Sequence, residues 1–369
     1  MRLSRRWLMP AVVGAGIVGI STVPHAFASG ASTPNLPPVT AAALLNEVAS
    51  TSARALSGTV RVDSALGLPA LPDRLVGSGM GLPALLTGSH TLRVAVAGPD
   101  MQRIALLGDL SETDFVHDGT DLWIYDSGTN SVTHQTVAAV DPSASVPTDL
   151  TPSGAAQQWL ADLDPSTTVS VAGTTTVAGR PAYELQLTPR TPGTLVGAVR
   201  IAVDSGTGVP LQVQVFPVGS NSSAFTVGFT GVSFSTPAAG TFRFTPPAGA
   251  TVNQSVTGAH SAPGVGVGAQ TGAAGVGGGA GTSKPSVSGT GWATVVTLPA
   301  ADLNSALPGT AAADPSRSRS GLDWINRLST QVPAGHLLTT SLFSVLVTND
   351  GRVLIGAVAP SVLEGMVAA

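Results

Sequence analysis

Apolar and polar residues alternate along much of the first two thirds of the chain. Val60 and Val62 flank Arg61, and Asp63 follows them. Because successive side chains of a strand point to opposite faces, this period of two predicts strands with one buried face. The same alternation recurs in five further sets: Leu92, Val94, Val96; Tyr183, Leu185, Leu187; Val199, Ile201, Val203; Leu211, Val213, Val215; and Phe225, Val227, Phe229.

Turn-forming sequences separate these strands. Asp118-Gly119, residues 127–130 and residues 205–208 are rich in Gly, Asn, Asp and Ser, which tolerate the positive φ angles of hairpin turns. Consecutive strands are therefore predicted to be antiparallel neighbours.

Two amphipathic helices are predicted among the strands. Thr40 can cap the first, which would place Leu44, Leu45, Val48 and Leu56 on one side. Thr151 and Pro152 can open the second, whose apolar side would contain Ala155, Ala156, Trp159, Leu160 and Leu163. The predicted fold class is therefore α+β with a large antiparallel sheet.

The N-terminus has the pattern of an export signal. Arg2, Arg5 and Arg6 precede the apolar residues 7–23, and Ala26-Phe27-Ala28 has the small-x-small form of a cleavage site. Residues 1–28 are predicted to be a signal peptide of the Sec or twin-arginine type, since residues 4–8 also fit the latter. The protein would be secreted or associated with the cell envelope. The alternative is an uncleaved membrane anchor, which the short, glycine-containing apolar stretch disfavours.

The C-terminal third begins with a change of composition. Residues 253–290 are rich in Gly, Ala and Ser without periodicity, which predicts a flexible linker. Residues 291–369 would form a small α+β unit, with a strand over 292–298, a short helix from Leu322 to Leu328 and a hairpin within 342–358. So small a unit is marginally stable alone, so we expect it to dock on the first domain or on a partner.

Composition excludes several classes of function. The net charge is −4, so phosphate backbones are not attracted, and no nucleic-acid partner is expected. The chain has no cysteine, which excludes disulfides, thiolate metal sites and a lipid-modified cysteine. Lys284 is the only lysine, and the Ala, Gly, Val, Thr and Pro bias is typical of an actinobacterial source.

Catalytic motifs are absent from the sequence, so the protein is predicted not to be an enzyme and to need no cofactor or metal. His117 and His134 could face each other across adjacent strands, but two histidines without a third ligand make a poor metal site. The acidic run of Asp109, Glu112 and Asp114 is predicted to be a solvated loop. Asp204 is predicted to cap its own turn.

Two segments resemble a known family. Residues 117–126 (HDGTDLWIYD) are similar to the DG-x-x-LW-x-Y strand of LolA-type lipoprotein carriers, and residues 242–252 (FRFTPPAGATV) resemble their closing F-x-F-x-PP-x-G-x-x-V segment. Residues 177–183 and 204–211 resemble the related RseB/MucB periplasmic regulators. The resemblance covers residues 36–252.

The resemblance implies an open antiparallel β half-barrel, with helices across its concave face and an apolar space that receives acyl chains. One position departs from the family: the carriers have an arginine before a proline that holds the helical lid, whereas this chain has Gly98-Pro99, with Arg93 and Arg103 nearby. The lid-locking contact is therefore not carried over.

Two functions follow from the resemblance. The first is an exported carrier or chaperone that holds a lipid or an acylated lipoprotein in the apolar groove. The second is an envelope sensor that regulates a membrane partner such as an anti-sigma factor. The residues predicted to line the groove are Leu44, Val48, Val60, Val62, Val94, Trp123, Tyr125, Trp159 and Tyr183.

Overall fold

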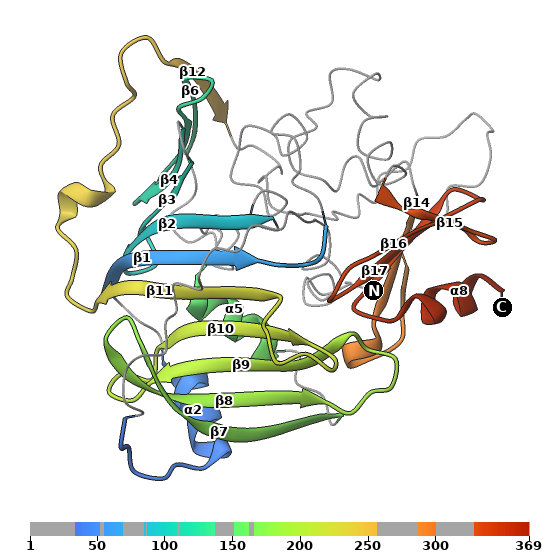
Figure 1. Ribbon diagram of the computed structural model, residues 1–369. Coiled ribbons are helices and arrows are strands. Elements are labelled where there is room, and N and C mark those ends of the chain that lie inside the picture. Colours follow the sequence, from blue (N-terminus) through green and yellow to red (C-terminus); the bar gives the residue numbers. More distant parts are fainter. Residues whose placement is uncertain are drawn as a thin grey trace, which may run out of the picture.

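A computed structural model describes residues 34–51, 55–68, 85, 87–108, 111–136, 151–161, 166–256, 286–299 and 328–368. Strands predominate in these ranges (Figure 1). The predicted signal peptide and most of the predicted linker lie outside the described residues. Among the helices that the structure describes, none has the length and apolarity needed to cross a membrane.

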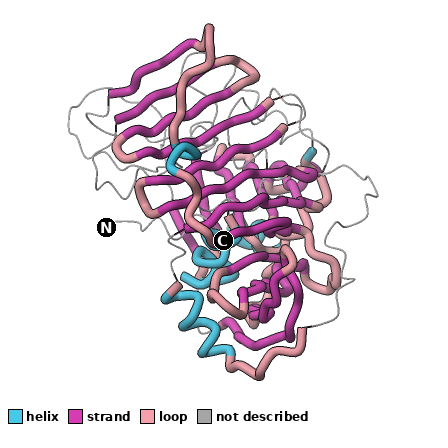
Figure 2. The backbone as a smooth tube through the Cα atoms, turned by 90° about the vertical axis from the view of Figure 1, so that its left-hand side faces the viewer, coloured by secondary structure: helices cyan, strands magenta, loops and turns pink. Residues whose placement is uncertain are grey.

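Twelve strands form one large sheet in the spatial order β12-β6-β5-β4-β3-β2-β1-β11-β10-β9-β8-β7. β1 and β11 join the two halves at the centre, and β12 and β7 are its edges, so the sheet is open. Figure 2 shows its strands stacked along the length of the molecule. The strands are β1 (Ala55–Ser64), β2 (Gly88–Ala97), β3 (Met101–Leu107), β4 (Glu112–Asp118), β5 (Asp121–Asp126), β6 (Ser131–Thr136), β7 (Thr167–Val177), β8 (Arg180–Pro189), β9 (Val196–Asp204), β10 (Pro210–Pro217), β11 (Phe225–Ser233) and β12 (Thr251–Val256).

The predicted antiparallel hairpins are confirmed from β1 to β6 and from β7 to β11. Gly119, Asn130 and Gly208 take positive φ angles of 66°, 47° and 69° in the turns that the sequence predicts. One pairing differs, because β12 lies parallel to β6. The chain returns from β11 across β3 and β4, so β12 enters the sheet from the same end as β6.

The two predicted helices are present. α2 (Ala41–Ser50) begins at Thr40, whose Oγ1 accepts a hydrogen bond from Ala43 N at 3.2 Å. α5 (Pro152–Ala161) begins at Thr151, whose Oγ1 accepts from Gly154 N at 3.1 Å. Leu56 was predicted to belong to the first helix but lies in β1, because α2 ends before it.

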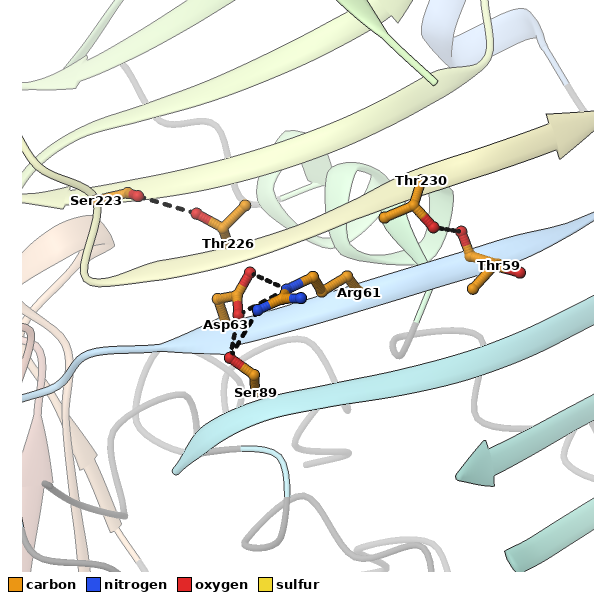
Figure 3. Close-up of polar contacts among 7 residues, drawn as sticks. All are labelled: Thr59, Arg61, Asp63, Ser89, Ser223, Thr226 and Thr230. Carbon is orange, nitrogen blue, oxygen red and sulfur yellow. Dashed lines mark hydrogen bonds and ion pairs between the residues drawn. The ribbon is translucent and has the colours of Figure 1, made fainter. Parts of the chain in front are cut away.

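The large sheet has an apolar face and a polar face. Val60 and Val62 of β1 share one buried cluster with Leu44 and Val48 of α2, which defines the apolar face as the side of the helices. Between these valines, Arg61 points to the polar face, where its Nε lies 2.9 Å from Asp63 Oδ2 (Figure 3). Such a partly exposed pair adds little stability, about 0–1 kcal/mol. Burial of the apolar face is therefore the main force that holds the helices on the sheet.

A second sheet of six strands forms the C-terminal unit, and α8 (Pro360–Ala368) packs on it through Leu363. The predicted hairpin is confirmed as β17 and β18, with Gly351 in its turn at a φ of 81°. The strands, in spatial order, are β13 (Ser286–Ser288), β14 (Val295–Pro299), β18 (Arg352–Gly356), β17 (Ser344–Thr348), β16 (Gly335–Thr339) and β15 (Thr330–Val332).

Three sequence predictions for this part need correction or stay open. Strands extend into both ends of the predicted linker, since β12 ends at Val256 and β13 begins at Ser286. Residues 291–293 form a short 3₁₀ helix (η4, Gly291–Ala293) rather than the start of the predicted strand. The helix predicted from Leu322 lies outside the described residues apart from Leu328.

The C-terminal unit docks on the end of the large sheet. Leu342 and Phe343, in the loop between β16 and β17, are buried in the same apolar cluster as the large sheet. Ser341 N donates to Leu66 O at 3.0 Å, and Ala359 N donates to Gly193 O at 2.7 Å. The small size of the unit predicted docking on the first domain or on a partner, and the structure contains the first of these contacts.

Candidate functional site: an apolar sheet face

The apolar face is packed differently in the two halves of the sheet. In β9 and β10, its side chains from Val199 to Val203 and from Leu211 to Val215 are fully buried, and α5 contacts β10 and β11. In β2, β3 and β5, Val96, Leu106 and Ile124 are only half-buried, although they pack against the same cluster. Accessible apolar side chains of this face therefore include those of β2, β3 and β5, besides Val169, Val171 and Tyr183 at the β7–β8 edge.

Five predicted groove residues lie together on this face but are not accessible. Leu44, Val48, Val60, Val62 and Val94 are each at most 3% exposed and belong to the buried cluster. The structure thus brings them together as core between the sheet and α2. The side chain of Trp159 in α5 lies outside the described residues.

Tyr183 also faces the apolar cluster, but its hydroxyl has a structural partner. The Tyr183 hydroxyl donates to Pro37 O at 2.8 Å, and Thr174 Oγ1 donates to Pro34 O at 2.8 Å. Both contacts hold the chain that leads into α2 against β7 and β8. Tyr183 therefore helps to hold residues 34–40, which precede α2, against the sheet.

Trp123 and Tyr125 lie on the polar face, so their prediction as groove residues together with Val60, Val62 and Val94 is wrong. The cross-strand register is continuous from β1 to β5 and places Trp123 opposite Val116 and Arg103, with Leu122 and Ile124 on the apolar face. The sequence correctly predicted that β5 is apolar on both sides. It did not reveal which side faces the helices, because that depends on the register of the whole sheet.

The two family-like motifs meet in an aromatic cluster on the polar face. The Trp123 ring stacks on His134 with centroids 3.8 Å apart, and Phe244 lies 5.5 Å from Trp123 and 5.8 Å from Tyr125. Phe242, in the same return segment, is fully buried. The LW-x-Y strand and the F-x-F segment therefore pack against each other.

The histidine pair is separated by the sheet. His117 pairs with Leu122 and so faces the apolar side, whereas His134 pairs with Trp123 and faces the polar side. β5 also lies between their strands. The idea that they face each other across adjacent strands is wrong, and they cannot share a metal ion.

The acidic run is not a solvated loop throughout. Asp114 is buried within β4, and its Oδ1 accepts from Arg103 Nε at 3.2 Å. Arg103 also donates to Thr241 O at 3.2 Å, which ties the return segment to the polar face. Arg93 lies opposite Ala105 on this same face. Neither arginine lies on the face that α2 and α5 cover, so the lid-locking contact of the carriers has no counterpart in these two residues.

Loss of the Phe244 ring should cost modest stability. Phe244→Ala removes a half-buried ring from the aromatic cluster, so we expect a fall of about 1–2 kcal/mol in the free energy of unfolding. Urea denaturation followed by Trp fluorescence measures it. A double-mutant cycle with Tyr125→Ala should give a coupling of about 0.5–1.5 kcal/mol. Additive losses would show that the two rings do not stabilise each other.

An ion pair between the buried Asp204 and the partly exposed Arg180 fixes the turn motif at the other end of the sheet. Arg180 Nε lies 2.7 Å from Asp204 Oδ1, and Arg180 Nη2 donates to Oδ2 at 2.9 Å. Thr207 N also donates to Asp204 Oδ2 at 2.9 Å, which confirms the predicted turn cap. Burial by itself raises the pKa of Asp204, but the hydrogen bonds from Arg180 and Thr207 outweigh burial and hold this pKa below its usual range.

No family model and no curated protein matches the sequence. The chain is similar to the solved complex of MucA and MucB from Pseudomonas aeruginosa, with 16% identity, coverage of 89% of this chain and 96% of that chain, and a TM-score of 0.42. It is also similar to a LolA superfamily protein from Nitrosomonas europaea, with 10% identity, coverage of 56% and 99%, and a TM-score of 0.23.

Similar solved structures thus include both groups whose motifs the sequence resembles. A third is an uncharacterized conserved protein from Thermus thermophilus, with 13% identity, coverage of 58% and 99%, and a TM-score of 0.32. At these identities and TM-scores, the similarity assigns neither a family nor a function to the chain.

Proposed function

We propose that this protein is an exported, non-enzymatic carrier that binds the acyl chains of a lipid or an acylated lipoprotein on the apolar face of β2–β5. The observation that carries the proposal is the incomplete burial of Val96, Leu106 and Ile124 on a face that is fully buried in β9 and β10. An acyl chain on this surface would gain about 0.8 kcal/mol for each CH₂ removed from water.

The open edges of the sheet support the same proposal. A closed barrel fixes its interior volume, whereas β12 and β7 at the ends of this sheet are not paired with each other. An open sheet can therefore admit chains of different length by a small change of curvature. The proposal needs no charged contact for affinity, which fits a chain with a net charge of only −4.

Native mass spectrometry of the protein exported by its own host tests this proposal. We expect a mass increment that corresponds to a stoichiometric lipid or acylated peptide and disappears after organic extraction. The extracted protein should then bind a fluorescent acyl probe. A protein that is empty after purification and also ignores acyl probes would refute the carrier function.

A regulatory protein is the second candidate, and the docking of the C-terminal unit favours it. Leu342 and Phe343 of that unit share one buried cluster with the large sheet, so occupancy of the sheet could shift the unit. In this candidate, a membrane protein such as an anti-sigma factor binds the C-terminal unit. Cross-linking in native membranes should then recover a transmembrane partner with the empty protein and less of it with the acyl-loaded protein. Equal recovery in both states would exclude such regulation.

A further inference from the structure

A row with three buried polar side chains crosses the apolar face of β3–β6, which also contains Thr113, Asp126, Ser131 and Thr133. Gln102 of β3 is paired with His117 of β4, His117 with Leu122 of β5, and Leu122 with Gln135 of β6. Side chains at paired positions point to the same face, so these residues form one line across four strands. The exposed fractions of Gln102, His117 and Gln135 are only 9%, 6% and 9%.

His117 lacks the hydrogen bond that a buried polar group normally has. Within the described part of the chain, its buried Nδ1 has no hydrogen-bond partner. Buried polar atoms without partners are rare in native proteins, and each calls for an explanation. His117 lies within β4, which is paired regularly with β3 and with β5. The backbone conformation therefore does not require a polar residue at this position.

Gln102 provides a second donor in the same row. Its Nε2 donates to Pro99 O at 2.8 Å, which fixes the amide beside His117. A glutamine amide has two N–H groups, so one donor is left for another acceptor. Gln102 and His117 therefore offer two neighbouring donors when the His117 proton is on Nδ1.

The next row along these strands is apolar in β3, β4 and β5 and ends at Thr133 in β6. Ile104, Phe115 and Ile124 are paired with one another, two residues from Gln102, His117 and Leu122, respectively. Residues two apart on a strand are about 7 Å from each other on the same face. A hydrocarbon chain over this apolar row would thus place a polar group at its end within reach of the polar row.

We infer that His117 and Gln102 bind the carbonyl oxygen of an acyl ligand, that is, of a fatty acyl ester, amide or acid. This assignment rests on the proposed carrier function and adds a specificity to it. The N–H groups of His117 and Gln102 donate to the carbonyl oxygen. The acyl chain lies over Ile124, the half-buried member of the apolar row, beside Ile104 and Phe115, which are 3% and 8% exposed. The carbonyl supplies the partner that His117 Nδ1 lacks.

Two ligands that differ only in the carbonyl test this assignment. Monopalmitoylglycerol contains an ester carbonyl, and hexadecylglycerol has the same chain joined through an ether. Below their micellar concentrations, we expect the wild-type protein to bind the ester about tenfold more tightly than the ether. His117→Leu should lower the affinity for the ester about tenfold and change that for the ether by less than about twofold.

His134→Leu is the matched control, because it changes a histidine on the opposite face of the sheet, two strands away in β6, and should preserve the preference for the ester. His117→Leu should fold at least as stably as the wild type, since it removes an unpaired buried polar group. In ¹⁵N NMR spectra, the Nδ1 resonance of His117 should shift with the ester and not with the ether.

The outcomes separate this assignment from the carrier function. Equal binding of ester and ether by the wild type, or an equal loss of both in His117→Leu, would overturn the carbonyl site while leaving the carrier function intact. Binding of neither ligand by the wild type would refute the carrier function and this site together.

Discussion

Leu106→Asp is expected to lower the affinity for a long-chain acyl probe about 100-fold, because the ligand would have to cover an unpaired carboxylate. Leu106 is half-buried on the apolar face, where its neighbours across the strands are Leu92 and Thr113. Adding Ile124→Asp, on the same face of β5, should abolish measurable binding. Fluorescence titration with the extracted, ligand-free protein gives both affinities.

Leu107→Asp is the matched control for this prediction. Leu107 is the next residue of the same strand and is also half-buried, but it points to the polar face. The acyl affinity of Leu107→Asp should stay within about twofold of the wild type, since its carboxylate would face away from the ligand. Similar losses in Leu106→Asp and Leu107→Asp would mean that acyl chains do not bind on this side of the sheet. Circular dichroism of each variant separates lost binding from lost folding.

Asp204→Asn is expected to cost about 2–4 kcal/mol of unfolding free energy at pH 7, which would be the largest loss of stability among the variants considered. The Asp204 side chain is completely buried and accepts from Arg180 and Thr207. Asparagine keeps the shape of the side chain but loses the negative charge. The turn between β9 and β10 would lose its tie to Arg180, at the start of β8.

The loss in Asp204→Asn should shrink as the pH falls. The pKa of Asp204 is lower in the folded protein than the value of about 3.9 for an unfolded chain, so the unfolded state binds more protons between these two values. The stability contributed by the carboxylate is therefore complete above the unfolded pKa and is lost as the pH falls through the folded pKa. Urea denaturation of the wild type and of Asp204→Asn, at several pH values from 7 downward, measures how the difference between their unfolding free energies shrinks. A difference that stays constant down to acid pH would contradict the charged hydrogen-bonded pair.

Asp350→Asn is the control for Asp204→Asn. Asp350 also forms an ion pair, with its Oδ2 at 2.8 Å from Arg352 Nε, and hydrogen bonds from Thr348 and Arg352 lower its pKa. Its side chain is 56% exposed, however, so water screens the pair. The loss should be about 0.5 kcal/mol or less.

Local patterns in the sequence were sufficient to predict the strands, the helix starts and the turns of this fold. The alternation of Val60 and Val62 with Arg61 predicted a strand with one buried face, and Thr40 and Thr151 predicted the helix starts. The turn cap by Asp204 was also readable, because it needs only residues three positions apart. These features depend only on residues that are close together in the chain, so the sequence alone is enough to predict them.

The sequence by itself thus determined the strands, the helix starts and the turns, and it indicated an apolar face without marking which part of it stays accessible. Only the tertiary structure decided that Trp123 and Tyr125 face away from the helices, that Val60 and Val94 are core, and that Val96, Leu106 and Ile124 are half-buried. It also aligned Gln102 with His117 on one face. The physical reason is that a period of two defines two faces of each strand, whereas pairing between strands far apart in the chain decides which faces coincide and what covers them.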